Sequence, residues 1–140
     1  MAKTIKVLLA DDHPSVRESI KRILESLPQV AVIAEASDGG EAVALATTHR
    51  PDIVLMDVSM PNVDGLEAAR RIGRDVPGVA VVVVTAYGDR DIAARAFKVG
   101  AAGFLIKNKL VTELAPAVDA IARGECYFGS GVESRWSAHA

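Results

Sequence analysis

The feature that most constrains this chain is a regular alternation of two hydrophobic patterns. Short apolar runs, rich in Val, Ile, Leu and Ala, occur at residues 5–10, 30–34, 53–56, 79–84 and 104–106. The runs are nearly continuous rather than alternating, which is typical of parallel strands buried on both faces of a sheet. We therefore predict five strands at these positions.

Segments with helical spacing follow each of these runs. In the first segment, for example, Val16, Ile20, Ile23 and Leu27 recur every three or four residues. Strict alternation of strands and helices implies right-handed crossovers, which place helices on both faces of the sheet. The expected fold is therefore α/β and flavodoxin-like: a doubly wound, five-stranded parallel sheet in the order 2-1-3-4-5 with five helices.

Several residues are typical of helix ends. Pro14 suits a first helical residue, and Asp38 and Asp64 suit N-caps because each precedes a glutamate by three positions. Gly100 and Gly124 suit the position that closes a helix. For the last helix we predict an N-cap at Thr112, which would place its proline in the first turn, where a missing N–H is tolerated.

Composition limits the function. The 140 residues fit one domain, and we expect a single folded unit over residues 1–124 with a linker or flexible tail over 125–140. A net charge of −2 and a pI of about 5.9 argue against direct contact with nucleic acid. The one cysteine, Cys126, has no disulfide partner, and neither a signal peptide nor a long apolar run is present. These features favour a cytoplasmic protein without a membrane segment.

The polar residues at the carboxyl ends of the predicted strands form the candidate site. They are Asp11, Asp12, Asp57, Thr85 and Lys107. In an open parallel sheet these ends lie at one edge, where ligands bind. Crowded carboxylates repel one another unless one is protonated or a hard divalent cation binds, and Mg²⁺ is the natural choice. An ammonium and a hydroxyl beside them would stabilise a phosphoryl group, so the set predicts phosphoryl transfer onto Asp57.

Each of these residues also has an ordinary structural interpretation. The aspartates suit turns and helix caps, and the lysine and threonine suit solvated or ordinary strand ends. Their occurrence at the ends of four different strands favours the site. We interpret His13 as a helix cap, because it directly precedes Pro14.

The order and spacing of these motifs resemble the receiver-domain signature of bacterial response regulators over residues 5 to 124. The matching motifs are Asp11-Asp12-His13-Pro14, Met56-Asp57, Met60-Pro61-Asn62-Val63-Asp64-Gly65, Thr85-Ala86 and Gly103-Phe104-Leu105-Ile106-Lys107.

The resemblance implies a role for each site residue. Asp57 is the phosphoacceptor, Asp12 is a direct Mg²⁺ ligand, Asp11 acts largely through water, and the backbone carbonyl of Ser59 completes the metal site. Thr85 and Lys107 hold the phosphoryl oxygens. The switch couples Thr85 to Phe104, which lacks the hydroxyl of the tyrosine found in many relatives, and Ser59 and Tyr87 modulate water access to the phosphoryl group.

The resemblance also implies partners. A sensor histidine kinase would donate the phosphoryl group, and a homodimer is one outcome of phosphorylation that the resemblance allows. The Asp-Asp-His-Pro start and residues 120–124 are similar to receivers joined to a LuxR-type helix-turn-helix. Such a DNA-binding domain needs roughly 60 further residues. The alternatives are therefore a receiver portion of a transcription factor and a single-domain regulator that acts through protein contacts.

Three rival classes remain for comparison. A flavin-binding protein would carry a Ser/Thr/Gly-rich phosphate loop after the first strand, where this chain has two aspartates and a proline. A haloacid-dehalogenase-like phosphatase would need a second acid where Ser59 stands, and would turn over external phosphomonoesters. An interaction module with a degenerate site would show no response to Mg²⁺.

Overall fold

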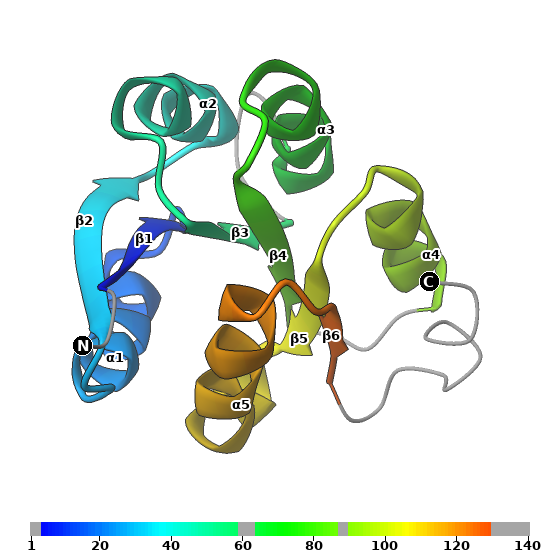
Figure 1. Ribbon diagram of the computed structural model, residues 1–140. Coiled ribbons are helices and arrows are strands. Elements are labelled where there is room, and N and C mark those ends of the chain that lie inside the picture. Colours follow the sequence, from blue (N-terminus) through cyan, green and yellow to red (C-terminus); the bar gives the residue numbers. More distant parts are fainter. Residues whose placement is uncertain (1–3, 59–63, 87–89, 130–140) are drawn as a thin grey trace.

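The computed structural model describes residues 4–58, 64–86 and 90–129, in which strands and helices alternate (Figure 1). The strands are β1 (Ile5–Ala10), β2 (Val30–Ala36), β3 (Ile53–Asp57), β4 (Ala80–Thr85), β5 (Gly103–Ile106) and β6 (Tyr127–Phe128). The helices are α1 (Pro14–Glu25), α2 (Gly39–His49), α3 (Gly65–Asp75), α4 (Arg90–Lys98) and α5 (Leu110–Ala122), and a 3-10 turn, η1 (Lys107–Lys109), precedes α5.

The strands form one parallel sheet in the order β2-β1-β3-β4-β5-β6. The first five follow the predicted order 2-1-3-4-5, so the expected fold class is confirmed. The sixth strand was not predicted. Its two residues lie in a segment without apolar periodicity. The segment joins the sheet through backbone hydrogen bonds, which cannot be predicted from a side-chain pattern.

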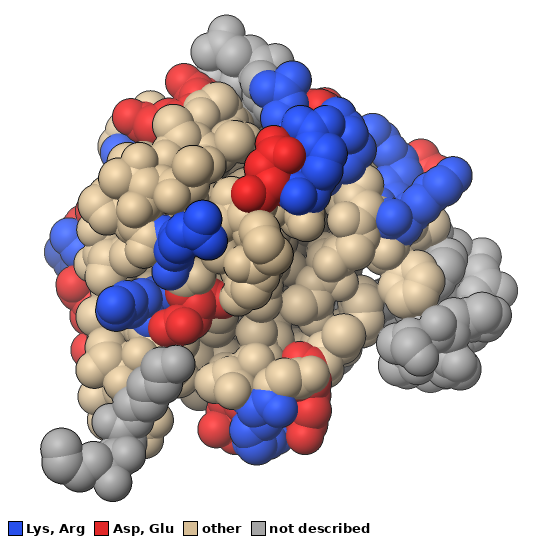
Figure 2. All heavy atoms as spheres, turned by 45° about the horizontal axis from the view of Figure 1, so that its top comes forward, with Lys and Arg blue, Asp and Glu red and all other residues tan. Residues whose placement is uncertain are grey.

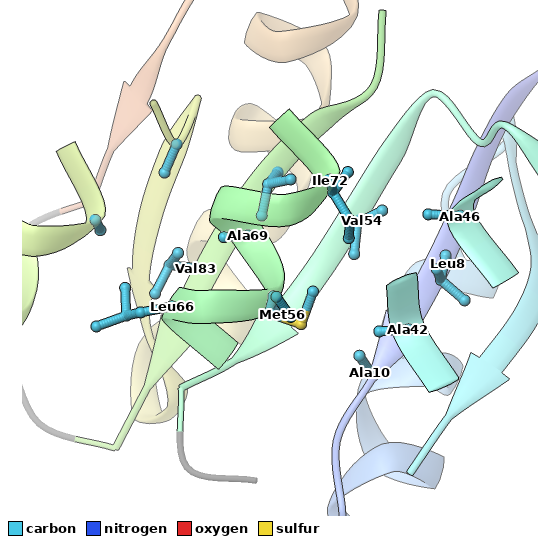
Figure 3. Packing of buried hydrophobic residues seen from close by; sticks show 14 of the residues in the cluster. Leu8, Ala10, Ala42, Ala46, Val54, Met56, Leu66, Ala69, Ile72 and Val83 are labelled. Atoms are coloured by element: carbon cyan, nitrogen blue, oxygen red, sulfur yellow. The ribbon is translucent and has the colours of Figure 1, made fainter. Parts of the chain in front are cut away.

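Alternate residues of each strand pack against different helical layers. Leu8 and Ala10 of β1 belong to a buried cluster with α2, α3 and α4, part of which is drawn in Figure 3. Val7 and Leu9 belong to a second cluster with α1 and α5. Because successive side chains of a strand point to opposite faces, a nearly continuous apolar run supplies both layers. The sheet is therefore covered by helices on both faces.

The predicted helix starts are confirmed for α1, α2 and α3. Pro14 is the first residue of α1, Asp38 accepts a hydrogen bond from the Glu41 N–H at 2.8 Å, and Asp64 accepts one from the Glu67 N–H at 2.8 Å. Each carboxylate also lies at the positive end of a helix, which stabilises it. Gly100 and Gly124 have φ angles of 87° and 83°, the left-handed conformation expected at a helix end.

The predicted start of α5 is wrong. The η1 turn leads directly into α5, which begins at Leu110, with Lys109 rather than Thr112 at the N-cap. The hydroxyl of Thr112 instead donates to the carbonyl of Lys109 at 3.2 Å. Pro116 is therefore inside the helix, where its ring nitrogen cannot donate to the carbonyl four residues earlier.

On the face shown in Figure 2, Lys and Arg side chains occur in groups that have Asp or Glu side chains beside them. On α3, for example, Glu67 pairs with both Arg70 and Arg71. Among the residues that the structure describes, none of the helices combines the length and the apolar character that crossing a bilayer requires.

Candidate phosphoryl and metal site

The sheet brings the predicted site residues to one edge. Asp57 and Thr85 are the last residues of β3 and β4, Asp11 directly follows β1, and Lys107 directly follows β5. The register confirms that they are level, because Asp57 pairs with Val84 and Thr85 with the last residue of β5. Asp11, Asp57 and Thr85 are each no more than 3% exposed. The edge therefore holds two buried acids and a buried hydroxyl.

Lys107 lies between two of the carboxylates. Its Nζ is 3.2 Å from Asp11 Oδ2 and 3.4 Å from Asp57 Oδ2, and its side chain is 22% exposed. One ammonium thus faces two buried acids, with Asp12 as a third acid nearby. Within the described part of the chain, the three carboxylates, when all are ionised, carry more negative charge than the Lys107 ammonium balances.

The oxygens of Asp11 and Asp12 are only partly satisfied. Asp11 Oδ1 accepts a hydrogen bond from the backbone N–H of His13 at 2.8 Å. Asp11 Oδ2 and Asp12 Oδ1 are buried and accept no hydrogen bond from the described residues, although Lys107 and the His13 ring are close enough for charge contacts. Buried acceptors without donors are costly, and a bound cation would remove that cost.

The geometry of the acids suits a cation of this kind. Asp11, Asp12, His13 and Asp57 each offer a ligand atom, and these atoms all lie within 4.8 Å of one another. The three carboxylates supply the hard oxygen donors that Mg²⁺ prefers. The acidic cluster Asp11, Asp12 and Asp57 is therefore consistent with the metal site of a receiver.

The predicted cap position of His13 is confirmed, but its side chain does not serve as the cap. His13 occupies the N-cap position of α1, but its side chain makes no capping hydrogen bond. Its Nδ1 instead lies 2.9 Å from Asp12 Oδ1 and 3.5 Å from Asp11 Oδ1, and the ring is 62% exposed. The two acids attract the ring, so the side chain turns toward the site rather than toward the helix.

Gly65 is a residue of the site that sequence reasoning did not single out. A Cβ atom there would lie 1.9 Å from the backbone oxygen of Asp57, and the Gly65 N–H donates to the carbonyl of Val58 at 3.2 Å. The start of α3 therefore packs directly on the backbone of Asp57. A glycine just after the N-cap Asp64, where helices seldom favour one, was the available signal.

The remaining predicted residues have different outcomes. Phe104 is fully buried, so its side chain already packs inside the protein. Ser59 and Tyr87 lie outside the described residues, and their predicted roles in the metal site and in water access stay predictions.

Comparison with known proteins supports the interpretation of the acidic cluster as the site of a receiver domain. Residues 7–119 match the family model described as "Response regulator receiver domain". The chain is 40% identical over 128 residues to "Response regulator UvrY" of Escherichia coli (strain K12), covering 91% of this chain and 59% of that protein. It is also 40% identical over 121 residues to "Transcriptional regulatory protein LiaR" of Bacillus subtilis (strain 168), covering 86% of this chain and 57% of that one.

Solved structures agree with the sequence relatives. A two-component response regulator of the LuxR family from Aurantimonas sp. SI85-9A1 superposes with a TM-score of 0.90 at 35% identity, covering 98% of each chain. The signal receiver domain of the putative response regulator NarL from Mycobacterium tuberculosis gives a TM-score of 0.84 at 35% identity, covering 89% of this chain and 100% of that one.

The chain belongs to the response regulator receiver domain family. Within it, the chain resembles regulators of the LuxR/NarL type, such as LiaR and NarL. A receiver is a phosphoacceptor in two-component signal transduction rather than an enzyme in the ordinary sense, and it implies a cognate histidine kinase. The chain spans less than two thirds of the length of the curated relatives described above.

Proposed function

We propose that this chain accepts a phosphoryl group on Asp57 from a sensor histidine kinase, with Mg²⁺ bound at the acidic edge, and changes its surface in response. The observation that supports this most is the charge balance of the pocket. Among the residues that the structure describes, two buried acids and a third beside them lie around the ammonium of Lys107. That excess of negative charge favours binding of a divalent cation.

The metal would be held by carboxylates of this chain. Asp12 would bind Mg²⁺ directly, Asp11 largely through water, and Asp57 through its carboxylate, with the carbonyl of Ser59 completing the set. When bound, Mg²⁺ would neutralise charge on the phosphoryl oxygens. The buried, incompletely satisfied oxygens of Asp11 and Asp12 support this assignment.

The transfer itself would be performed by Asp57 and its neighbours. The carboxylate attacks phosphorus, so that an O–P bond to Asp57 forms as the N–P bond of the kinase phosphohistidine breaks. Lys107, already 3.4 Å from Asp57, would pair with one phosphoryl oxygen. Thr85 would donate its hydroxyl to another. Ser59 and Tyr87 would affect the lifetime of the product by controlling water access.

Phosphorylation would then bias two surface states. The phosphoryl group adds a charge of about −1.5 to −2, which draws Thr85 and Lys107 toward it. Because Thr85 ends β4 and Lys107 directly follows β5, the face formed by α4, β5 and α5 would change. Phe104 is fully buried in the structure. We therefore expect its shift to be a repacking within the core rather than a movement from solvent.

The output we propose is control of transcription through an attached DNA-binding domain. The names of LiaR as a transcriptional regulatory protein and of UvrY as a response regulator support this choice. In that arrangement the chain after α5, which begins with β6, would lead to the DNA-binding domain, the protein would work in the cytoplasm, and phosphorylation would favour a homodimer. The alternative is a single-domain regulator that acts by protein contacts.

The test uses acetyl phosphate as a small-molecule donor. Incubation with Mg²⁺ should add one phosphoryl group to the wild-type chain by intact mass, and chelation of Mg²⁺ should prevent it. Asp57→Asn should remain unmodified. An unmodified wild type, or equal modification of the Asn variant, would refute the assignment. Steady hydrolysis of an external phosphomonoester would instead support a phosphatase.

A further inference from the structure

Residues 125–129, which follow α5, form a short segment that binds along the edge of β5. We call this segment the C-terminal strap. The Tyr127 N–H donates to the carbonyl of Ala102, and the Gly129 N–H donates to the carbonyl of Phe104, each at 2.9 Å. Figure 1 shows β6 beside β5 at the end of the sheet. The strap is therefore attached to the backbone of the strand that contains the predicted switch residue.

The side chains of the strap reach both faces of the sheet. Phe128 packs against the buried cluster that contains Phe104, and its ring centroid lies 6.3 Å from that of Phe97 in α4, with the ring planes at 54°. Tyr127 packs against the other cluster, beside α5. Phe128 thus contacts elements of two kinds, the strand β5 and the helix α4. Any relative movement of these two must disturb its packing.

Two glycines permit the close approach of the strap. A Cβ atom on Gly103 would lie 2.8 Å from the backbone oxygen of Tyr127. A Cβ atom on Gly129 would lie 2.5 Å from Glu113 Oε1 of α5. The Gly103 contact is with backbone of the strap, so a larger residue at Gly103 would push the strap away, whereas a larger residue at Gly129 would first displace the flexible Glu113 side chain. The sequence at both positions is therefore compatible with the strap.

The position of Phe104 connects the strap to the phosphoacceptor. In the register of the sheet Phe104 pairs with Val83 of β4 on one side and with Phe128 of the strap on the other. Movement of Thr85 and Lys107 toward a phosphoryl group would shift the ends of β4 and β5 relative to α4. A two-residue strand has few hydrogen bonds with which to follow such a shift.

We propose that the C-terminal strap holds β5 in its unphosphorylated arrangement and separates from β5 when Asp57 is phosphorylated. The inference rests on the proposed function of Asp57 and adds how the signal leaves the domain. Release of the strap changes the tether between the receiver and any sequence that follows it. By thermodynamic linkage, a variant with a loosened strap must bind a phosphoryl mimic more tightly.

The test uses the 140-residue chain with Mg²⁺ and beryllofluoride as the phosphoryl mimic. Hydrogen exchange of the Tyr127 and Gly129 amides, followed by NMR, should become about tenfold faster when the mimic binds. Phe128→Ala should exchange fast in both states and bind beryllofluoride roughly threefold more tightly. Val111→Ala, at an exposed position of α5 outside the strap, is the matched control and should behave as the wild type.

Two further results complete the design. Gly103→Ala should loosen the strap while keeping Phe128, so it should reproduce the effect of Phe128→Ala. If the amides around Asp57 respond to beryllofluoride while Tyr127 and Gly129 keep their protection, the strap proposal is overturned and the proposed function stands. If the amides around Asp57 do not respond, the proposed function fails, and the strap proposal fails with it.

Discussion

Two sites in this protein combine carboxylates with basic side chains and differ in burial and in charge balance. At the carboxyl edge of the sheet, Asp11 and Asp57 are buried, and each has an oxygen within 3.4 Å of the Lys107 ammonium. On the surface of α3, Glu67 is one-third exposed and is bound by two guanidinium groups, at 2.6 Å from Arg70 and 2.9 Å from Arg71. Around the first site, the described residues supply less positive charge than the carboxylates carry. On α3, two guanidinium groups surround one carboxylate.

The difference separates a binding site from a structural ion pair. Hydrogen bonds from Arg70 and then Arg71 hold the pKa of the Glu67 carboxyl at about 2, well below its ordinary value, so this group is already satisfied. The edge has buried oxygens on Asp11 and Asp12 without hydrogen-bond donors among the described residues. Clusters of the edge type gain most from a ligand, because the folded protein does not itself supply the missing charge.

The largest change in unfolding free energy is expected at Gly65, where α3 packs on the backbone of Asp57. Gly65→Ala would place a methyl group 1.9 Å from the Asp57 backbone oxygen and should cost about 3 kcal/mol or more of unfolding free energy. Gly73→Ala is the matched control, because its Cβ would meet only the Val99 oxygen at 3.8 Å. It should stabilise the helix by about 0.5–1 kcal/mol. Urea unfolding of both variants measures the difference, and equal effects would contradict the close packing at the edge.

The next effect concerns Mg²⁺ itself. At about one hundred times its dissociation constant, Mg²⁺ should raise the free energy of unfolding by about 2.7 kcal/mol, because it binds only the folded edge. Asp12→Asn should lose most of this gain, whereas Glu67→Gln should keep it in full. Thermal unfolding at a series of Mg²⁺ concentrations checks both. An equal loss in the two variants would mean that the edge is no different from the surface pair.

Neutralising one carboxylate should change the free energy of unfolding in opposite directions at the two sites. Without Mg²⁺, Asp57→Asn should raise the free energy of unfolding by about 1 kcal/mol, because it removes one of several crowded negative charges. Glu67→Gln should lower it slightly, because two arginines lose their shared partner. Urea unfolding in the presence of a chelator gives both values. Destabilisation by Asp57→Asn would show that Lys107 already neutralises the pocket.

The smallest effect is the pH dependence of the α3 ion pair. The folded pKa of Glu67 is about 2 and lies below the ordinary value of 4.5, so its stabilising contribution is complete above pH 4.5. The contribution is lost as pH falls from 4.5 through 2. The wild type should therefore lose more stability than Glu67→Gln over this window. Unfolding curves of both proteins at several pH values test this, and parallel curves would contradict the depressed pKa.

Much of the fold was predictable because burial on both faces of a parallel sheet leaves a clear pattern. The runs containing Val7, Leu8 and Leu9 must be apolar without alternation, and the caps Asp38 and Asp64 depend only on local sequence. The start of α5 depends instead on how η1 continues into the helix. The strap depends on backbone hydrogen bonds to a distant strand. Neither the start of α5 nor the strap produces a hydrophobic periodicity in the local sequence.

The candidate site was predictable in its members and less so in its details. Strand order alone brings Asp11, Asp57 and Lys107 together, since all three lie at strand ends of one sheet edge. The turn of the His13 ring toward the acids and the packing of Gly65 on Asp57 follow from three-dimensional contacts. Such contacts join residues that are not spaced by any helical or strand period.

The most direct test of the account is to locate the cation. Crystals grown with Mn²⁺, which prefers oxygen ligands as Mg²⁺ does and scatters anomalously, would show its position. We predict one strong anomalous peak bound by Asp12 and Asp57, with Asp11 beside it and Lys107 directed at the same pocket. A peak bound elsewhere, or an edge without any peak at saturating Mn²⁺, would contradict the claim that these acids form one metal site.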